Sequence, residues 1–573
     1  MKRMVFFFCL FEIAVIATAS NYPNNRYPLA PKPYIELPFG TIMEWLSEMP
    51  ARQKNGAIIP ESTVKGYAER FNQNDDELYV QFVPNSESAG FLTKNIPRFE
   101  CPDKELEEIY YFRWWTYRKH IKKTPGGYVI TEFIPDVPWA GKYNAINDAA
   151  VYHYSEGRWL HNHEYLNGYS DYWFRQGGAV RSYSCPMIYA HYNDFLATGD
   201  DTLIKEFFPD LIKYYEAWEG DHFDEKHSLF WQIDDRDWGE MTIGGHGLRP
   251  LINSFMIADA KALAKIAKHF GNTEQQTRFE KKAAELQKKM QETLWDKNAQ
   301  FFKVMNLWER HPTTAWKRGE PKVVPTLADV RELYGYAPWM FNLAGPEYAV
   351  AWQFLMDPKH FYAPYGPSFA EQCHPEFKIS YEGHECQWNG PSWPMSTTLT
   401  LLGLTNLLQT QDQHVISKKD YFDMVKLYAH CHHLTKEDGT VVPWIDENLN
   451  PFTGDWIART RLKTWKAGTW DSGKGGVERG KDYNHSEFCD LIITGLVGLI
   501  PEEGDNLTIH PLLPEGVWDY FCLENVLYHG KLITVIYDKT GKKYEKGKGL
   551  TVLVNGKKVA SSSDLSVITC KLK

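Results

Sequence analysis

Between residues 100 and 500 the sequence repeatedly shows the apolar spacing of amphipathic helices, with no comparable run of alternating strand residues. The segment after Asp200 and Asp201 is typical, because its apolar side chains recur at three- and four-residue steps as far as Trp218. This spacing predicts a helix that the two aspartates cap. Pro209 lies inside the segment and predicts a kink or a break.

The same signals predict further helices along this stretch. Pro250 opens one that Gly271 ends, and a charged helix follows from Thr273 to Leu294. Shorter helical patterns occupy residues 103–120, 184–197, 328–342, 347–356, 392–409, 419–433 and 485–498.

This organisation predicts an (α/α)6 toroid, in which inner helices converge and long loops at one end carry the functional site. About a dozen helices joined alternately by short turns and long aromatic loops fit that architecture. An α-solenoid is the alternative, but it requires a repeat of roughly 34 to 47 residues, and the sequence shows none.

The two ends of the chain differ from the helical stretch at residues 96–500. Residues 20–95 are rich in Pro, Asn and Tyr, and we expect an extension of loops and short strands that wraps the main domain. After Pro501, strand patterns alternate with turns, and Asn555-Gly556 is a strong hairpin signal. We therefore predict that residues 501–573 form a small β-sandwich with a structural role.

The N-terminus has the features of a secretory signal peptide. Lys2 and Arg3 precede an apolar run, and Ala17-Thr18-Ala19 offers a small-residue cleavage site. The run is too short to cross a membrane comfortably, and no later segment supplies a span. We expect residues 1–19 to be removed and the mature protein to be secreted or periplasmic.

Composition narrows the range of partners. The formal charge is −10 with acidic and basic residues interleaved, so a nucleic acid is excluded as a partner. The chain has 21 Trp, 33 Tyr and 31 Phe, and aromatic faces suit the apolar faces of sugars, although most of these rings must build the core. The cysteines beyond residue 19 show no paired spacing, and most should be isolated buried thiols.

Glu447 is the first candidate catalytic residue. It precedes an Asn450-Pro451 turn and a closing Gly454, so its loop should hold the carboxylate in a fixed direction. A loop glutamate is often only a solvated charge, but the apolar residues on both sides of this one favour a partly buried, functional group.

A second acidic cluster covers residues 234–240, and its sequence is Asp-Asp-Arg-Asp-Trp-Gly-Glu. Crowding with like charges can raise the pKa of a carboxyl group, which a proton donor requires. Asp237 beside Trp238 is the first choice for the acid and Glu240 the second, while Asp235 and Arg236 are candidates for substrate binding. A simple ion-pair cluster is the alternative.

Further loop residues are candidates for holding a sugar, each weak on its own. They lie beside helix starts or in aromatic loops, and they are Trp159, Trp388, Asn389, Trp393, Asn484 and His485. His430-Cys431-His432-His433 looks like a metal cluster, but adjacent positions on a helix do not face one way, and no matching ligand group lies nearby in the sequence. We expect no metal and no organic cofactor.

The loop at residues 445–454 (Ile-Asp-Glu-Asn-Leu-Asn-Pro-Phe-Thr-Gly) resembles one in the glycoside hydrolase group that contains family 63, the trehalases of family 37 and mannosylglycerate hydrolase. There the Glu before N-x-N/D-P-x-T-G is the general base, which implies that role for Glu447. Residues 388–394 (Trp-Asn-Gly-Pro-Ser-Trp-Pro) resemble the W-R-G-P-x-W segment of the same group.

The resemblance also implies that Asp237 is the acid, because it stands where the group carries E-S-G-x-D. This chain departs from that motif and reads Ile-Asp-Asp-Arg-Asp instead. Residues 511–514 and 518–520 resemble the C-terminal sandwich of α-L-rhamnosidases. The resemblance covers roughly residues 100 to 540 and implies a six-hairpin glycosidase fold.

Taken together, the residues and the resemblance predict an exported, exo-acting glycoside hydrolase that cleaves a terminal, α-linked sugar from an oligo- or polysaccharide with inversion. Asp237 would be the acid and Glu447 the base. A polysaccharide lyase that uses Tyr483, Asn484 and His485 is one alternative. Phosphorolysis, which would need basic residues near the position of the water, is another. A surface glycan-binding protein without catalysis is the alternative from a different class.

Overall fold

We analysed a computed structural model that describes residues 57–311, 317–464 and 476–572. The expected signal peptide, residues 1–19, lies outside the described residues. Within the N-terminal extension the structure places two helices, α2 (Glu61–Gln73) and α3 (Asn85–Asn95), where we predicted loops and short strands. The prediction was wrong here because Val64, Tyr67, Ala68 and Phe71 already have helical spacing, and they bury one face of α2 against α4 (Lys104–His120).

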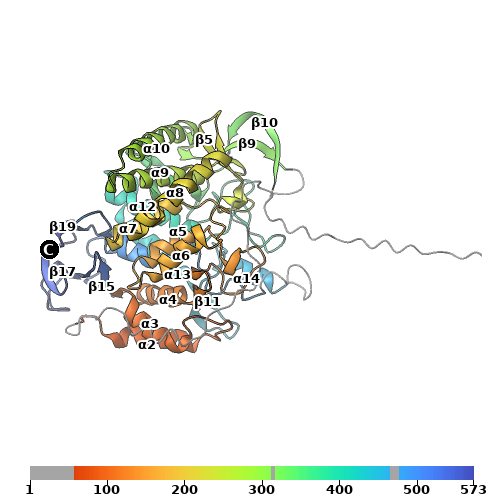
Figure 1. The fold of residues 1–573 in the computed structure, drawn as a ribbon. Helices are drawn as coiled ribbons and strands as arrows, with labels where there is room; N and C mark the ends of the chain where they lie inside the picture. Colours follow the sequence, from red (N-terminus) through yellow and green to blue (C-terminus); the bar gives the residue numbers. More distant parts are fainter. Residues whose placement is uncertain (1–56, 312–316, 465–475, 573) are drawn as a thin grey trace, which may run out of the picture.

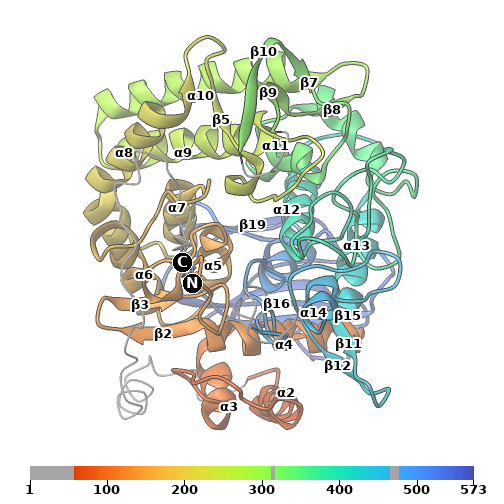
Figure 2. The same ribbon diagram turned by 90° about the vertical axis from the view of Figure 1, so that its right-hand side faces the viewer.

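The helices follow one another around a ring, and the chain colours progress around it from orange through green to blue (Figure 2). The (α/α)6 toroid predicted from the sequence is confirmed. Its principal helices are α4 (Lys104–His120), α5 (Ala150–Gly157), α6 (Glu164–Arg175), α7 (Met187–Thr198), α8 (Thr202–His222), α9 (Pro250–His269), α10 (Thr273–Leu294), α12 (Pro394–Thr410) and α13 (Lys418–Cys431).

Most of the long helices match their sequence signals. Both α9 and α10 have the predicted bounds, and Gly271 between them adopts φ 70°, the left-handed conformation that ends a helix. Pro209 was expected to kink or break its helix, and the helix is not broken there, since α8 runs from Thr202 to His222 with Pro209 inside it.

Three predicted helical stretches differ in length or in helix type in the structure. Residues 328–342 form only η3 (Leu333–Tyr336) and α11 (Ala337–Met340), and residues 347–356 form the 3-10 helix η4 (Pro346–Phe354). The stretch 485–498 contains a π-helix, η6 (Leu491–Leu496).

A five-stranded sheet inserted in the helical region was not predicted. Its order is β10 (Arg318–Leu327), β9 (Met305–Arg310), β6 (Gly247–Leu248), β5 (Leu229–Gln232) and β4 (Phe223–Asp224). Strands β4, β5 and β6 have two to four residues, too few to show a period of two. Strands β9 and β10 are longer but lie mostly outside the core, so they lack the alternation of a half-buried strand.

The C-terminal region forms the two sheets expected of a small sandwich. One sheet has the order β1 (Arg98–Glu100), β15 (Tyr520–Tyr528), β16 (Lys531–Asp538), β17 (Gly549–Val554) and β18 (Lys557–Ser562). The other has the order β13 (Leu499–Ile500), β14 (Asn506–Ile509) and β19 (Ile568–Lys571). The Asn555-Gly556 turn joins β17 to β18 with φ angles of 49° and 78°, as a tight hairpin turn requires.

These strands cover one end of the ring, and loops with short elements occupy the other (Figure 1). Helix α14 (Ile457–Leu462) lies on the loop side, away from β15, β17 and β19 (Figure 1). Among the described residues, no helix combines the length and the apolar character that crossing a bilayer requires.

Candidate active site

The loop that carries Glu447 runs from β12 (Val441–Pro443) to α14, and its own backbone holds it in shape. The side chain of Asn450 accepts from Phe452 N at 3.0 Å, and Gly454 N donates to Asn450 O at 2.9 Å. The predicted Asn-Pro turn therefore forms and fixes the loop.

Backbone hydrogen bonds join this loop to the other two motif segments. Leu449 and Ser392 exchange a pair of bonds of 2.8 and 3.0 Å, which ties the Glu447 loop to the start of α12. Trp388 N donates to Glu240 O at 3.1 Å, which ties that same segment to the Asp234–Glu240 loop. Three segments far apart in the sequence therefore meet.

Glu447 is 1% exposed and is held by a guanidinium group that the sequence did not reveal. Arg479 donates from Nε to Glu447 Oε1 at 2.6 Å and from Nη2 to Oε2 at 2.9 Å. The thiol of Cys386 also donates to Glu447 Oε2 at 3.2 Å. A bidentate ion pair fixes both the position and the plane of the carboxylate.

Asp446 and Gly480 support Glu447 from its own side. Asp446 accepts from Glu447 N at 2.8 Å, and burial together with the Glu447 charge raises its pKa to about 7. A Cβ atom on Gly480 would lie 1.9 Å from Asp446 Oδ1, so only glycine fits there. Since Gly480 follows Arg479 directly, the close approach lets the guanidinium reach Glu447.

Asp237 is fully buried and engaged in an ion pair. Arg249 Nε donates to Asp237 Oδ2 at 2.7 Å, and both side chains are at most 1% exposed. Burial raises the pKa of Asp237, while the Arg249 charge opposes that shift. Its other oxygen, Oδ1, is buried without a hydrogen-bond partner among the described residues.

Glu240 has a different environment in the same loop, with 26% of its side chain exposed. Burial raises its pKa well above the ordinary value, and the Asp235 and Glu385 carboxylates act in the same direction. A raised pKa favours the protonated form that a proton donor requires, and Glu240 Oε2 is buried without a hydrogen-bond partner among the described residues.

Cys386 lies between Glu240 and Glu447. Glu240, His384 and Cys386 bring three ligand-type atoms within 4.8 Å of one another, and the sulfur is 3.2 Å from Glu447 Oε2. The Glu240 and Glu447 carboxylates are therefore at most about 8 Å apart, which admits the spacing of inverting and of retaining glycosidases.

Two further acids adjoin Glu447. Glu132 accepts a hydrogen bond from the Tyr483 hydroxyl and lies near Asp148. Burial and the Asp148 charge raise the pKa of Glu132 well above its ordinary range, and burial raises the pKa of Asp148 to about 6. No local sequence motif marks either residue.

Several predicted binding residues gather around these acids. Trp388 and Trp393 stack face to face at 4.0 Å, and His485 lies 3.8 Å from the Tyr483 ring centroid. The two ring nitrogens of His485 and Asn389 Oδ1 are buried without a hydrogen-bond partner among the described residues, so they are available to a ligand.

The remaining predicted residues have mainly structural contacts. Trp238 donates from Nε1 to Ser184 O at 2.7 Å, and Asn484 donates from Nδ2 to Thr131 O at 3.3 Å. Asp235 and Arg236 pair with each other at 3.2 Å at the partly exposed edge of the loop. Trp159 does not join the site, because it is fully buried and donates to Asp490 Oδ1 at 2.6 Å.

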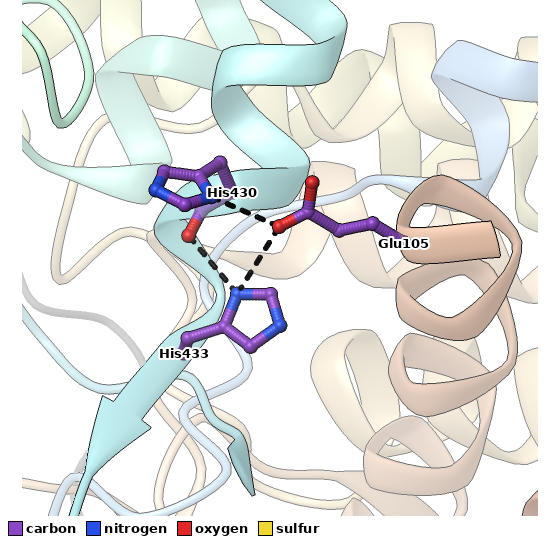
Figure 3. A group of neighbouring side chains, drawn as sticks. All are labelled: Glu105, His430 and His433. Carbon is purple, nitrogen blue, oxygen red and sulfur yellow. Dashed lines mark hydrogen bonds and ion pairs between the residues drawn. The ribbon is translucent and has the colours of Figure 1, made fainter. Parts of the chain in front are cut away.

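Three groups of side chains in the described residues have spacings that could hold a metal ion. One of them brings His430 and His433, from the end of α13 and from β11 (His433–Thr435), toward Glu105 in the first turn of α4 (Figure 3). Glu105 Oε1 is 2.9 Å from His430 Nδ1 and 3.8 Å from His433 Nδ1. Glu105 is remote in sequence, so local spacing could not reveal this group.

The second group, at Glu240, belongs to the site above. The third comprises His360, Glu371 and Cys373.

Comparison with known proteins places these loops in a described family. Residues 142–241 and 234–486 match the mannosylglycerate hydrolase MGH1-like glycoside hydrolase domain, and residues 502–561 match the C-terminal domain of glycosyl hydrolase family 65. A solved structure named sialidase is similar at TM-score 0.79 and 36% identity, covering 89% of this chain and 45% of that one. This chain therefore spans less than half the length of that relative.

Two other solved structures show lower similarity. A GH78 rhamnosidase of Bacillus sp. GL1 aligns at TM-score 0.46 and 13% identity, covering 77% of this chain and 40% of that one. A GH63 mannosylglycerate hydrolase of Thermus thermophilus aligns at TM-score 0.43 and 12% identity, covering 67% of this chain and 100% of that one. The family match spans well over half of the sequence and includes Asp237, Glu240 and Glu447, so the chain belongs to the MGH1-like glycoside hydrolases.

Proposed function

We propose that this protein is an exported, exo-acting glycoside hydrolase that removes a terminal, α-linked sugar with inversion of configuration. The observation that carries this proposal is the convergence of Glu240 and Glu447 on Cys386 from two separate loops. Two carboxyl groups on opposite sides of a glycosidic bond are what this chemistry requires. The apolar segment at residues 4–16 supports export.

Glu447 is the base in this mechanism. Arg479 holds its carboxylate in place, and lone pairs remain on both oxygens to accept a proton from a water molecule. That water then attacks the anomeric carbon from the face opposite the leaving group.

Glu240 is the acid. Burial and the Asp235 and Glu385 carboxylates raise its pKa well above the ordinary value, which favours the protonated form that an acid needs, and 26% of its side chain is exposed. Asp237, the first choice from the sequence, supports the same loop through its buried ion pair with Arg249. We therefore assign Asp237 a positioning role.

Three variants test these roles against aryl glycosides that share one sugar but differ in leaving group. A poor leaving group needs the acid, whereas a dinitrophenolate departs without protonation. Glu240→Gln should lose about 10²–10⁴-fold in kcat on the poor leaving group and remain within roughly tenfold on the good one. Glu447→Gln should lose activity on both.

Asp237→Asn is the matched comparison within the same loop. If Asp237→Asn shows the leaving-group dependence and Glu240→Gln does not, the acid is Asp237 after all. Anomeric proton NMR of the first product reports inversion or retention, and product size reports exo or endo action. The panel should begin with α-mannosides, α-glucosides and α-L-rhamnosides, because the family description names a mannosyl compound.

A polysaccharide lyase is the second candidate, and His485 favours it. Burial lowers the pKa of His485 well below its ordinary value, so the ring is neutral and could accept a proton, and Tyr483 lies against it. A lyase product carries an ultraviolet-absorbing double bond. If ultraviolet absorbance grows during polymer cleavage and this growth persists in Glu447→Gln, the reaction is elimination and not hydrolysis.

A further inference from the structure

Glu105, His430 and His433 lie together outside the candidate active site, and we call them the histidine–glutamate cluster (Figure 3). One nitrogen of each imidazole and one oxygen of the carboxylate lie within 4.8 Å of one another. Glu105 Oε1 is 2.9 Å from His430 Nδ1 and 3.8 Å from His433 Nδ1. Two ligands of a tetrahedral zinc ion, each about 2.0–2.1 Å from the metal, are about 3.3 Å apart, so small side-chain rotations would give these atoms that spacing.

The surroundings of the cluster leave it open to an ion from solvent. The exposed fractions are 53% for His430, 38% for Glu105 and 20% for His433, which supplies an entry path. The His430 ring stacks on Tyr365 with its centroid 5.7 Å away, and this contact orients the imidazole. His433 Nδ1 also lies 3.0 Å from His430 O, and a metal ion would replace that hydrogen bond.

The charges nearby favour this cluster over the third group of possible ligands described above. In the third group, Arg331 donates from its backbone N to Glu371 Oε1 at 2.9 Å and from Nη1 to Oε2 at 2.7 Å, so a cation of the protein already holds that carboxylate. In the histidine–glutamate cluster, Lys426 lies one helical turn before His430 but pairs with Asp103 Oδ2 at 2.8 Å.

The types of ligand indicate which ion fits. Two imidazole nitrogens and a carboxylate oxygen suit zinc and neighbouring transition metals, whereas magnesium and calcium prefer oxygen ligands throughout. Three protein ligands leave the fourth tetrahedral position of a zinc ion to water.

We propose that the histidine–glutamate cluster binds a zinc ion and thereby fastens α4 to the segment that carries Glu447. The backbone of His433 contacts both ends of that segment. Before the Glu447 loop, β11 pairs with β12 so that His433 is opposite Pro443. After the loop, Trp456 donates from Nε1 to His433 O at 2.9 Å. The proposal goes beyond glycoside cleavage and does not depend on it.

Calorimetric titration with Zn²⁺ tests the site on tag-free, full-length protein that has first been treated with a chelator. We expect one ion per chain to bind at the cluster. Glu105→Gln and His430→Ala each remove one of three ligands and should weaken this binding at least about 100-fold, no less than the loss of an outer-shell partner does. Mg²⁺ at the same concentrations should not bind there.

The matched control is His414→Ala. It removes an exposed histidine that belongs to none of the three groups, so the titration should be unchanged. Cys373→Ser and His384→Ala each remove a ligand from one of the other two groups and should also leave binding at the cluster unchanged.

Hydrogen exchange measures the connection to the Glu447 segment. Saturating Zn²⁺ should slow amide exchange in residues 433–443 of the wild type, because an ion that binds only the folded hairpin lowers the population of its open form. The same addition should have no effect on these amides in Glu105→Gln.

Three results would overturn the proposal. One is a wild type that binds no Zn²⁺, and another is binding that neither Glu105→Gln nor His430→Ala weakens. Binding that is lost only in Cys373→Ser or only in His384→Ala places the ion in another group. If Zn²⁺ binds at the cluster but exchange in residues 433–443 is unchanged, the ion does not fasten the Glu447 segment. None of these measurements involves a glycoside, so their failure leaves the proposed function untouched.

Discussion

Asp237 and Glu240 lie three residues apart in one loop, and their surroundings differ. Asp237 is 0% exposed and pairs with Arg249, whereas 26% of the Glu240 side chain is exposed. Burial raises the pKa of both groups, and the Arg249 charge opposes that shift at Asp237. Sequence order alone could not separate them, because both lie in the same run of acids. The two residues differ in the side chain that pairs with each carboxylate. The partner of Asp237 is Arg249, which lies outside the acidic run at residues 234–240.

Substitution of these two residues should therefore affect stability differently. Asp237→Asn leaves the buried Arg249 charge without its counterion and should lower the free energy of unfolding by about 3–5 kcal/mol. Glu240→Gln should change it by less than about 1 kcal/mol, since its side chain is partly exposed. Urea denaturation followed by circular dichroism measures both. Equal losses would mean that Glu240 is as structural as Asp237.

The raised pKa of Asp446 should make the stability of the protein depend on pH. Its pKa is about 7 in the folded protein against an ordinary value of 3.8, so between these values the folded state binds a proton that the unfolded chain lacks. The stabilisation is complete below about pH 4 and is lost as the pH rises through about 7.

Asp446→Asn keeps an acceptor for Glu447 N and removes this titration. The slope of unfolding free energy against pH between 4 and 7 should become less negative by up to about 1.4 kcal/mol per pH unit. Other buried acids contribute their own slopes, so the difference between variant and wild type is the quantity to measure. An unchanged slope would show that Asp446 does not bind a proton in the folded protein.

At the scale of elements, the site depends on loops that approach one another so closely that a side chain larger than that of glycine would not fit between them. Gly480 is the clearest case, because a Cβ there would lie 1.9 Å from Asp446 Oδ1 and 3.3 Å from Glu447 Cγ. Gly480→Ala should push the Glu447 loop outward and lower kcat by about 10²-fold, the effect of a misplacement of roughly 1 Å.

Gly66→Ala is the control for this substitution, since nothing lies within 4 Å of the added carbon in α2. It should leave kcat unchanged and slightly favour the helix. Initial rates on the best substrate and thermal midpoints distinguish the two effects. Normal activity in Gly480→Ala would mean that the loop moves freely and that the close approach has no role in positioning Glu447.

The elements that sequence reasoning could predict are those with local signals. Periodicity located α9 and α10, and the Asn450-Pro451 turn indicated that the Glu447 loop is rigid. Strands β4, β5 and β6 were missed because two to four residues carry no period, whereas the stretches 328–342 and 485–498 were predicted as longer helices than the structure contains. Arg479 was missed for another reason, because its function depends on a contact with Glu447 across 32 residues that no local pattern encodes.

At the scale of the whole molecule, the C-terminal strands and the helical ring pack around one continuous hydrophobic core. Strand β1, which precedes the ring, pairs with β15 of the sandwich, and buried residues of both regions belong to one core. Asn525 is the central connection, since its Nδ2 donates to Ile96 O at 3.0 Å and its carbonyl accepts from His161 Nε2 at 2.9 Å.

This shared core predicts a single unfolding transition. Scanning calorimetry of the full chain should show one peak whose van't Hoff and calorimetric enthalpies agree, provided that unfolding is reversible.

Asn525→Ala removes a buried donor from Ile96 O and should lower the free energy of unfolding by about 1–3 kcal/mol without splitting the peak. Asn525 has φ 66°, so Asn525→Gly separates the loss of the side chain from backbone strain. Two peaks in the wild type, with the smaller one alone shifted by Asn525→Ala, would show instead that the sandwich unfolds independently and that the ring is stable without it.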